Sequence, residues 1–282
     1  MTEPTPSGST DTIAFIGGGN MARSLIGGLV ARGHDPGRIR VAEPVESLRA
    51  ALATDFGVQT FEHARDACDG ATQWLLAVKP QVMRQVCMDL APVAQAQSPL
   101  VLSVAAGITA GQLQRWLGGS RELAIVRAMP NTPALLGAGV TGLFASAAVD
   151  ATQRKASTQL LAAAGTTVWI DDEAQMDAVT AVSGSGPAYV FLLAEAMQQA
   201  GESQGLPPQA ARALVQQTLL GAATMLARLE DPAPVLRARV TSPGGTTQAA
   251  IETFEAGGFQ ELVGRAIAAA THRGRELSAT ND

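Results

Sequence analysis

Short apolar runs alternate with helical stretches through roughly the first 170 residues, and this alternation constrains the fold more than any other feature. Five runs read as strands: 12–16, 39–42, 74–78, 100–104 and 124–127. After the first run, Met21, Leu25, Ile26 and Leu29 recur at helical spacing. Strands that alternate with helices form parallel sheets, because each helix carries the chain back to the edge where the next strand begins. The pattern predicts a doubly wound α/β domain that extends to about residue 172.

The first predicted strand ends in the sequence GGGNMA, which matches the G-x-G-x-x-G/A fingerprint of Rossmann-like folds with alanine in the last place. Gly17 allows a tight turn, Gly19 lets a pyrophosphate approach the backbone, and Ala22 lets the helix pack on the strand. Free amides at Asn20 and Met21 would bind the phosphate. We therefore predict a dinucleotide site, with a turn that serves packing alone as the alternative.

The cofactor is less sharply indicated than the site. Glu43 ends the second predicted strand, 24 residues beyond Gly19. An acidic side chain there commonly accepts a hydrogen bond from the adenosine ribose and repels a 2′-phosphate, which favours NADH. Arg49, or Arg40 just before the strand end, could instead meet the phosphate of NADPH. Both NADPH and NADH stay open with NADH slightly ahead, and a solvated charge is the alternative for Glu43.

Two further loops follow predicted strands and would lie at the same edge of the sheet, where ligand contacts gather. We assign the first of them to cofactor binding: Ala77, Val78, Lys79 and Pro80. An ordinary exposed lysine is the alternative for Lys79. The second loop, RAMPNTP at 127–133, places two prolines around Asn and Thr, which makes it rigid and polar. It either shapes a substrate pocket or is a plain crossover.

Strand signals stop at Asp177, and the rest of the chain reads as helices. A Ser or Gly cap with Pro187 in the first turn predicts a helix that runs to Ser203, and a second follows Pro207 and ends at Leu229. Both are rich in small residues, which suit a bundle core or a subunit interface. We expect a flexible tail at 1–11, a dinucleotide-binding domain at 12–172 and a helical domain at 173–282.

Serine, threonine, proline and glycine crowd together in VTSPGGTTQAA at 240–250. The segment offers hydroxyls and successive backbone amides ahead of a predicted helix: Ser242, Gly244, Gly245, Thr246 and Thr247. Amides that converge at a helix start form an anion site that suits a carboxylate. A plain connection between helices is the alternative. Together with a nicotinamide domain, the segment indicates a reductase for a small carboxylate-bearing molecule.

Composition argues against several other classes of protein. The net charge of −5 argues against a nucleic-acid partner, and apolar stretches are interrupted before the ~18 residues that span a bilayer. Cys68 and Cys87 have neither disulfide nor metal-site spacing, so we expect a reduced, cytoplasmic setting. The three histidines lie outside every motif, and Ser183 and Pro187 stand where a nucleophile elbow needs glycine. Hydrolysis by a triad or a metal is therefore not expected.

As a set, the motifs resemble those of the pyrroline-5-carboxylate reductase family over about residues 12–278. The motifs are IGGGNMA at 16–22, AVKP at 77–80, SVAAGIT at 103–109, RAMPNTP at 127–133, AVSGSGPAY at 181–189 and VTSPGGTT at 240–247. The resemblance implies reduction of the C=N bond of 1-pyrroline-5-carboxylate by NAD(P)H, which yields L-proline in the last step of proline synthesis. It also implies a homodimer through interlocked C-terminal helices, often with five dimers in a ring.

The resemblance further implies individual roles. Ser242 and the amides of Gly245 and Thr246 would hold the substrate carboxylate between this loop and the nicotinamide. Thr247 would bond to the ring nitrogen, and Glu230 looks like the family's acidic residue near that nitrogen. Glu43 departs from the pattern, because NADPH-using relatives often carry a small hydroxyl or neutral residue there. Ala64 stands where some relatives have an asparagine near the adenosine end.

Two rival functions share the predicted layout. A β-hydroxyacid dehydrogenase would carry a catalytic lysine on the long helix of the second domain, but the segment from Pro187 to Ser203 contains none. A non-catalytic NAD(P) sensor would keep the fold without turnover. The intact loop at 242–247 argues against that second rival.

Overall fold

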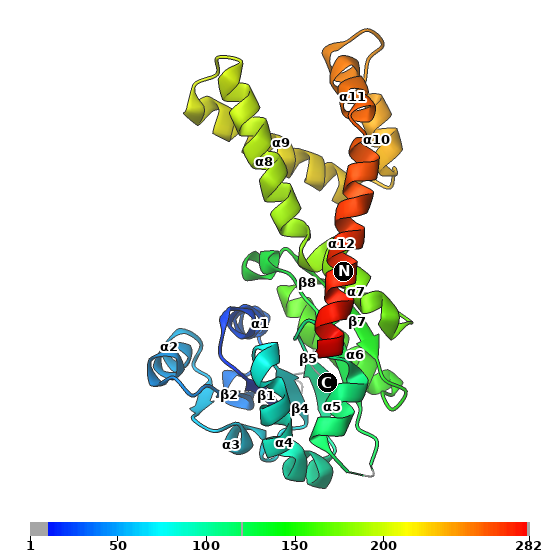
Figure 1. Cartoon of the computed structure of the whole chain (residues 1–282). Helices are drawn as coiled ribbons and strands as arrows, with labels where there is room; N and C mark the ends of the chain where they lie inside the picture. Colours follow the sequence, from blue (N-terminus) through cyan, green and yellow to red (C-terminus); the bar gives the residue numbers. More distant parts are fainter. Residues whose placement is uncertain (1–10, 120, 281–282) are drawn as a thin grey trace. The chain divides into compact units, whose positions relative to one another are not determined.

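The computed structural model describes residues 11–119 and 121–280 (Figure 1). Contacts between Cα atoms group them into two compact units. The first contains residues up to Ser185 together with those from Ala270 onward, and the second is Gly186–Ala269. The predicted tail at 1–11 lies outside the described residues except for Asp11.

The first unit contains an eight-stranded sheet in the order β3-β2-β1-β4-β5-β6-β7-β8. The strands are β1 (Ile13–Ile16), β2 (Ile39–Ala42), β3 (Gln59–Phe61), β4 (Gln73–Leu76), β5 (Leu100–Ser103), β6 (Ile125–Met129), β7 (Gly139–Ala145) and β8 (Gly165–Trp169). The order reverses between β1 and β4, and this point is where doubly wound sheets bind their ligands. All five predicted strands are present, so the Rossmann-like fold class is confirmed.

Helices cover both faces of this sheet. They are α1 (Asn20–Ala31), α2 (Glu46–Phe56), α3 (Ala64–Cys68), α4 (Pro80–Gln97), α5 (Ala110–Leu117), α6 (Ala151–Leu161) and α7 (Met176–Val179). Ile13 and Phe15 of β1 pack in one core cluster with α1, whereas Ala14 and Ile16 pack in the other with α4. Because both faces of β1 are buried, the strand reads as an uninterrupted apolar run.

The five predicted strands are parallel, but the sheet also contains an antiparallel strand that the sequence pattern does not predict. β7 pairs antiparallel to β6, with Val126 opposite Ala145. Only residues 130–138 separate the two strands, and a parallel return needs a connection of about a dozen residues or more. β8 then pairs parallel to β7, because α6 supplies a crossover between them.

The second unit is helical, as predicted. It contains α8 (Gly186–Ser203), α9 (Pro208–Arg228), α10 (Ala233–Arg239), α11 (Thr246–Ala256) and most of α12 (Phe259–Thr280). Helix α8 begins at Gly186, directly after Ser185 and with Pro187 in its first turn, as the predicted helix entry has it, whereas the motif also contains Ser183. That residue lies in a π-helical turn (Thr180–Gly184), and its hydroxyl donates to the carbonyl of Val179 at 2.8 Å.

The two compact units part after Ser185, later than the predicted boundary at 172/173. Residues 173–185 belong with the sheet because they pack on β7, where a Cβ at Gly142 would lie 2.4 Å from Val179 Cγ1. The end of α12 also returns to the first unit, since the side-chain amide of Gln112 donates to the carbonyl of Ser278 at 3.0 Å.

Candidate dinucleotide and carboxylate sites

The glycine turn (Gly17, Gly18 and Gly19) connects β1 to α1 at the carboxyl edge of the sheet. Gly17 has a φ of 103°, and its amide donates to the carbonyl of Ala42 at 2.9 Å. A Cβ at Gly17 would lie 2.8 Å from the carbonyl oxygen of Ala77. Any side chain here would therefore strain the backbone and clash with the segment that follows β4.

Gly19 has different surroundings. It caps α1 with a φ of −70°, and a Cβ there would meet nothing within 4 Å among the described residues. The fold itself does not need glycine here, so the open backbone suits a ligand that approaches closely, as a pyrophosphate does. The amides of Asn20 and Met21 begin α1 and lack partners within the helix, whereas Ala22 is fully buried. These residues fit the pyrophosphate of a dinucleotide.

The predicted cofactor segment after β4 lies against the glycine turn. A Cβ at Gly17 would meet the Cγ1 of Val78 at 3.2 Å, as well as the carbonyl of Ala77. Lys79 is exposed at the N-cap of α4, and Pro80 opens that helix. The structure therefore brings this segment to the switch point between β1 and β4.

Glu43 is buried, with 8% of its surface exposed, so it is not a solvated strand-end charge. Its Oε2 accepts the amide of Gly18 at 3.0 Å, and its Oε1 accepts the amide of Val45 at 3.1 Å. Each carboxylate oxygen thus has a main-chain donor from this chain. Glu43 binds the middle residue of the glycine turn directly.

The two arginines considered for a 2′-phosphate lie at different edges of the sheet. Arg40 contacts the carbonyl of Asp69, which precedes β4, so its guanidinium lies at the amino edge, away from the glycine turn. Arg49 lies at the carboxyl end of β2. Its Nη1 donates to the carbonyls of Glu43 at 2.8 Å and Pro44 at 2.7 Å.

Asn131 of the loop at 127–133 serves the protein's own backbone. Its side-chain nitrogen donates to the carbonyl of Ser183 at 3.0 Å, and its side-chain oxygen accepts the amide of Val140 at 3.0 Å. The side chain is buried. These contacts favour a structural role for this loop, as a connection between antiparallel strands, because the amide group joins β7 to the π-helical turn.

Sequence reasoning missed a buried ion pair in the same region. Arg127 of β6 donates from Nη1 to Glu173 Oε1 at 2.9 Å, and the same oxygen accepts the amide of Ala110 at 2.7 Å. No periodic pattern could indicate this pair, because its members are 46 residues apart. It ties the segment after β8 to the centre of the sheet.

The carboxylate loop (residues 242–247) precedes α11 in the helical unit. Gly244 has a φ of 70°, and its amide donates to the Oε1 of Gln248 at 2.7 Å. The amide of Gly245 donates to the carbonyl of Ser242 at 3.0 Å. The loop is thus ordered by its own hydrogen bonds, and the predicted carboxylate donor Gly245 is already bonded within it.

The remaining predicted substrate residues also lie in the helical unit. α11 begins at Thr246, so the amides of Thr246 and Thr247 are its first N–H groups. Thr246 is exposed and Thr247 is half-buried. Glu230 is exposed in the turn between α9 and α10. The dinucleotide residues therefore belong to one unit and the predicted substrate residues to the other.

Two kinds of feature are absent from the described residues. No three or more His, Cys, Asp or Glu side chains in that part of the chain form a group that could hold a metal ion. No helix within 11–119 and 121–280 is long and apolar enough to cross a membrane.

The two thiols are both buried, and burial raises the pKa of Cys68 and of Cys87 from 9.0 to about 12. The fold thus favours the neutral thiols. Their contribution to stability is complete below pH 9.0 and is lost as the pH rises toward about 12. At about pH 8 we expect no reaction of the native chain with a thiol reagent and full reaction after unfolding. A thiol that reacts quickly in the native protein would contradict this expectation.

Comparison with known proteins agrees with this geometry. Residues 12–107 match the family model described as NADP oxidoreductase coenzyme F420-dependent, and residues 173–277 match pyrroline-5-carboxylate reductase dimerisation. The glycine turn lies at the switch point of a doubly wound sheet, and the same region matches the NADP oxidoreductase model. The chain is therefore an NAD(P)-dependent oxidoreductase.

The relatives identify the family within that class. The chain is 51% identical to the pyrroline-5-carboxylate reductase of Pseudomonas aeruginosa, over 96% of this chain and 98% of the relative. It is similar to the structure of a pyrroline-5-carboxylate reductase from Coxiella burnetii, with a TM-score of 0.92, 43% identity and coverage of 96% and 99%. The Plasmodium falciparum pyrroline carboxylate reductase with NADP bound has a TM-score of 0.83, 27% identity and coverage of 96% and 100%. The chain belongs to the pyrroline-5-carboxylate reductase family.

Proposed function

We propose that the chain reduces the C=N bond of 1-pyrroline-5-carboxylate to give L-proline, in proline biosynthesis. The observation that carries this proposal is the similarity of both halves to one family across nearly the whole chain. When bound, NAD(P)H supplies the hydride for the imine carbon. The glycine turn and the amides of Asn20 and Met21 hold the pyrophosphate, and the segment from Ala77 to Pro80 lies beside it.

The carboxylate loop would bind the substrate. The Gly245 amide donates within the loop, so we assign the substrate carboxylate to the Ser242 hydroxyl and the amides of Thr246 and Thr247. Gly244 supports this turn through its positive φ. The Thr247 hydroxyl would bond to the ring nitrogen and stabilise the amine that develops there. Glu230 is proposed as the acidic residue near that nitrogen. That the carboxylate loop and the bound nicotinamide lie on either side of the substrate stays a prediction.

The main task of the protein in this reaction is to position the imine and the nicotinamide relative to each other. A protonated cyclic imine is already electrophilic, which fits a site built from hydroxyls and amides rather than a histidine. Holding the imine carbon in line with the nicotinamide and excluding water would account for most of the rate enhancement.

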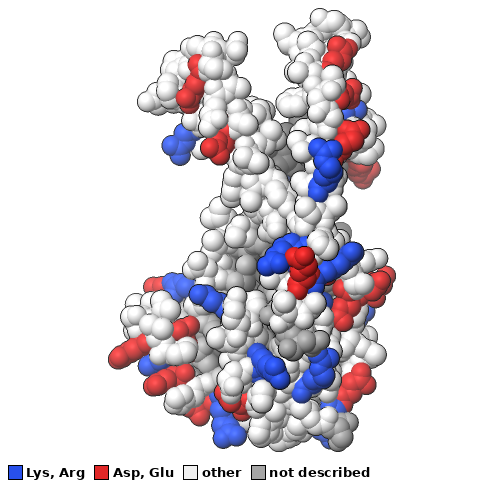
Figure 2. Space-filling view, viewed as in Figure 1, with Lys and Arg blue, Asp and Glu red and all other residues white. Residues whose placement is uncertain are grey.

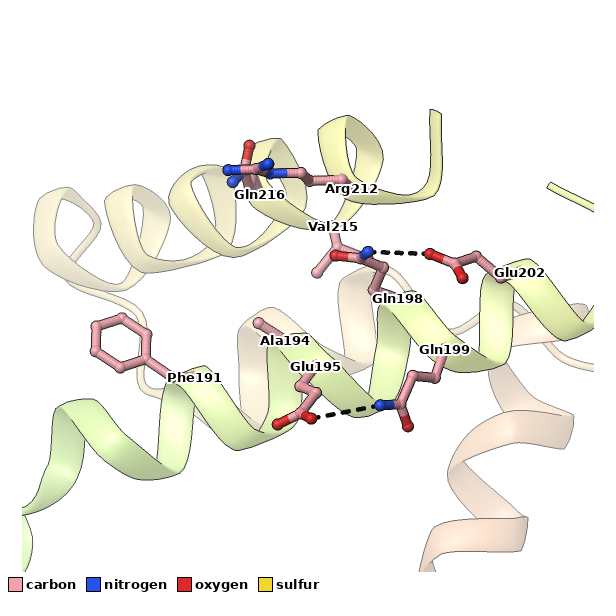
Figure 3. A pocket seen from close by; sticks show the side chains of 9 residues that line it. All are labelled: Phe191, Ala194, Glu195, Gln198, Gln199, Glu202, Arg212, Val215 and Gln216. Carbon is pink, nitrogen blue, oxygen red and sulfur yellow. Dashed lines mark hydrogen bonds between the residues drawn. The ribbon is translucent and has the colours of Figure 1, made fainter. Parts of the chain in front are cut away.

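We also propose a homodimer through the C-terminal helices. None of the residues of α8 is buried, and Phe191 and Leu192 are 67% and 66% exposed. A groove of about 520 Å³ lies between α8 and α9 (Figure 3). The visible surface of these two helices carries only scattered charges (Figure 2). The groove is lined largely by polar and charged side chains, such as Glu195, Gln198 and Arg212, so the apolar contact comes from the exposed side chains of α8. An exposed apolar helix face of this kind fits a second copy of the chain. Assembly of five dimers and a cytoplasmic setting stay predictions.

Replacing Leu192 with aspartate tests this dimer. The change places a charge on the exposed apolar face of α8, where burial against a partner would be costly. In sedimentation experiments, we expect the wild-type chain to behave as a dimer or larger assembly and the variant to shift toward the monomer. A wild-type monomer at micromolar concentration would contradict the proposal.

Loss of NAD(P)H absorbance on addition of 1-pyrroline-5-carboxylate tests the activity. The purified chain is assayed with NADH and NADPH separately, and L-proline is identified among the products. We expect stoichiometric formation of L-proline. Absence of turnover with both dinucleotides, while either one still binds, would instead support a non-catalytic sensor.

A further inference from the structure

Three charged side chains gather where the adenosine end of a bound dinucleotide would lie. This adenosine-end cluster consists of Glu43 at the end of β2, Arg49 on α2 and Glu62 just after β3. All three belong to the first compact unit, and Glu43 contacts the glycine turn directly. The cluster carries two acidic groups and one basic group.

The negative charge of Glu43 is fixed in place. Its oxygens accept the amides of Gly18 and Val45 at 3.0 and 3.1 Å, so the carboxylate cannot rotate away from an approaching anion without losing both bonds. A Cβ at Gly18 would lie 3.2 Å from the Cβ of Glu43. Glu43 is thus joined directly to the turn that would hold the pyrophosphate.

The positive charge of Arg49 lies beside Glu43 but is already engaged by other groups of the chain. Its Nη1 donates to the carbonyls of Glu43 and Pro44, and its Nη2 lies 3.8 Å from Glu62 Oε2. The arginine side chain is 19% exposed and its guanidinium is therefore held against the protein. To bind a 2′-phosphate, Arg49 would have to leave both carbonyls and its acidic partner.

We propose that the adenosine-end cluster selects NADH over NADPH. Glu43 repels the 2′-phosphate as a fixed charge, and Glu62 keeps Arg49 from offering compensation. This mechanism differs from ribose recognition by a free carboxylate, because both oxygens of Glu43 already accept amides. Repulsion between like charges a few ångströms apart near a protein surface is large enough to weaken NADPH binding roughly 100-fold relative to NADH. The inference rests on the proposed dinucleotide site and is independent of which imine is reduced.

Binding to the free enzyme provides the test, with no substrate present. Dissociation constants for NADH and NADPH are measured by fluorescence titration, and 5′-AMP and 2′,5′-ADP are compared as competitors. For the wild type we expect NADPH to bind roughly 100-fold more weakly than NADH, and 2′,5′-ADP more weakly than 5′-AMP. Equal binding, or tighter binding of the 2′-phosphorylated ligands, overturns the proposal.

Two substitutions separate the roles within the cluster. Glu43→Gln removes the charge, so the dissociation constants of NADPH and NADH are expected to differ by no more than about 10-fold. This expectation holds even if the substitution weakens both dinucleotides through its effect on the glycine turn. Glu62→Gln removes the acidic partner of Arg49 and leaves its two bonds to carbonyl oxygens, so NADPH affinity should rise while NADH affinity stays unchanged. A ratio that moves in neither variant overturns the proposal.

Glu122→Gln is the matched control. It removes the same charge from an exposed residue that precedes β6 at the amino edge of the sheet, and its ratio should equal that of the wild type. If NADH binds selectively but the imine is not reduced, the cofactor inference stands and the proposed function fails. If neither dinucleotide binds to the wild type, the cofactor inference fails.

Discussion

Thr247→Ala is expected to lower kcat about 100-fold, in line with the loss of one hydrogen-bond donor that acts on charge developing in a transition state. The hydroxyl is proposed to bond to the ring nitrogen, and the alanine side chain cannot. Alanine favours helix at this second residue of α11, so folding stability should not fall. Steady-state kinetics should show the loss in kcat, whereas the dissociation constant of NAD(P)H should be unchanged.

Two further variants make the Thr247 experiment specific. Thr247→Ser keeps the hydroxyl and should restore most of the rate. Thr253→Ala removes a hydroxyl of the same helix that donates to the carbonyl of Ala249 at 2.9 Å, and it should leave kcat unaltered. An unchanged rate in Thr247→Ala would remove this residue from the mechanism.

Gly19→Ala is expected to weaken NAD(P)H binding roughly 100-fold without lowering the free energy of unfolding, because this position lets the pyrophosphate approach the backbone. The added methyl meets no described atom of the protein within 4 Å, and the φ of −70° suits alanine. The methyl would stand only in the way of the ligand. Titration with the dinucleotide and denaturant unfolding of the free chain measure the two effects separately.

Gly17→Ala provides the contrast. Its φ of 103° and a Cβ 2.8 Å from the Ala77 carbonyl predict a loss of about 1–3 kcal/mol in folding stability in addition to weaker binding. Destabilisation by Gly19→Ala equal to that of Gly17→Ala would show that both glycines serve packing alone. That result would remove Gly19 from the proposed cofactor site.

Strands that the sheet buries on both faces could be predicted, and the others could not. β1 is apolar throughout and β5 is apolar up to its last residue, Ser103, because their apolar residues pack on one of two core clusters. β3 is three residues long with a polar start, and β8 alternates between exposed and half-buried positions. β7 runs antiparallel to β6 because the connection between them is too short for a crossover. The residues of this connection carry no pattern from which its length or the strand direction could be predicted.

The sequence by itself determined the class of protein, because the glycine turn, the carboxylate loop and the apolar strands are local patterns with local physical meanings. Only the tertiary structure decided between the arginines. Arg40 and Arg49 are equally plausible phosphate ligands along the chain, yet one lies at the amino edge of the sheet and the other beside Glu43. The bonds from Glu43 to Gly18 and from Arg127 to Glu173 join residues 25 and 46 positions apart. Such pairings depend on which strands become neighbours, and this is decided by burial of the whole sheet rather than by any segment of it.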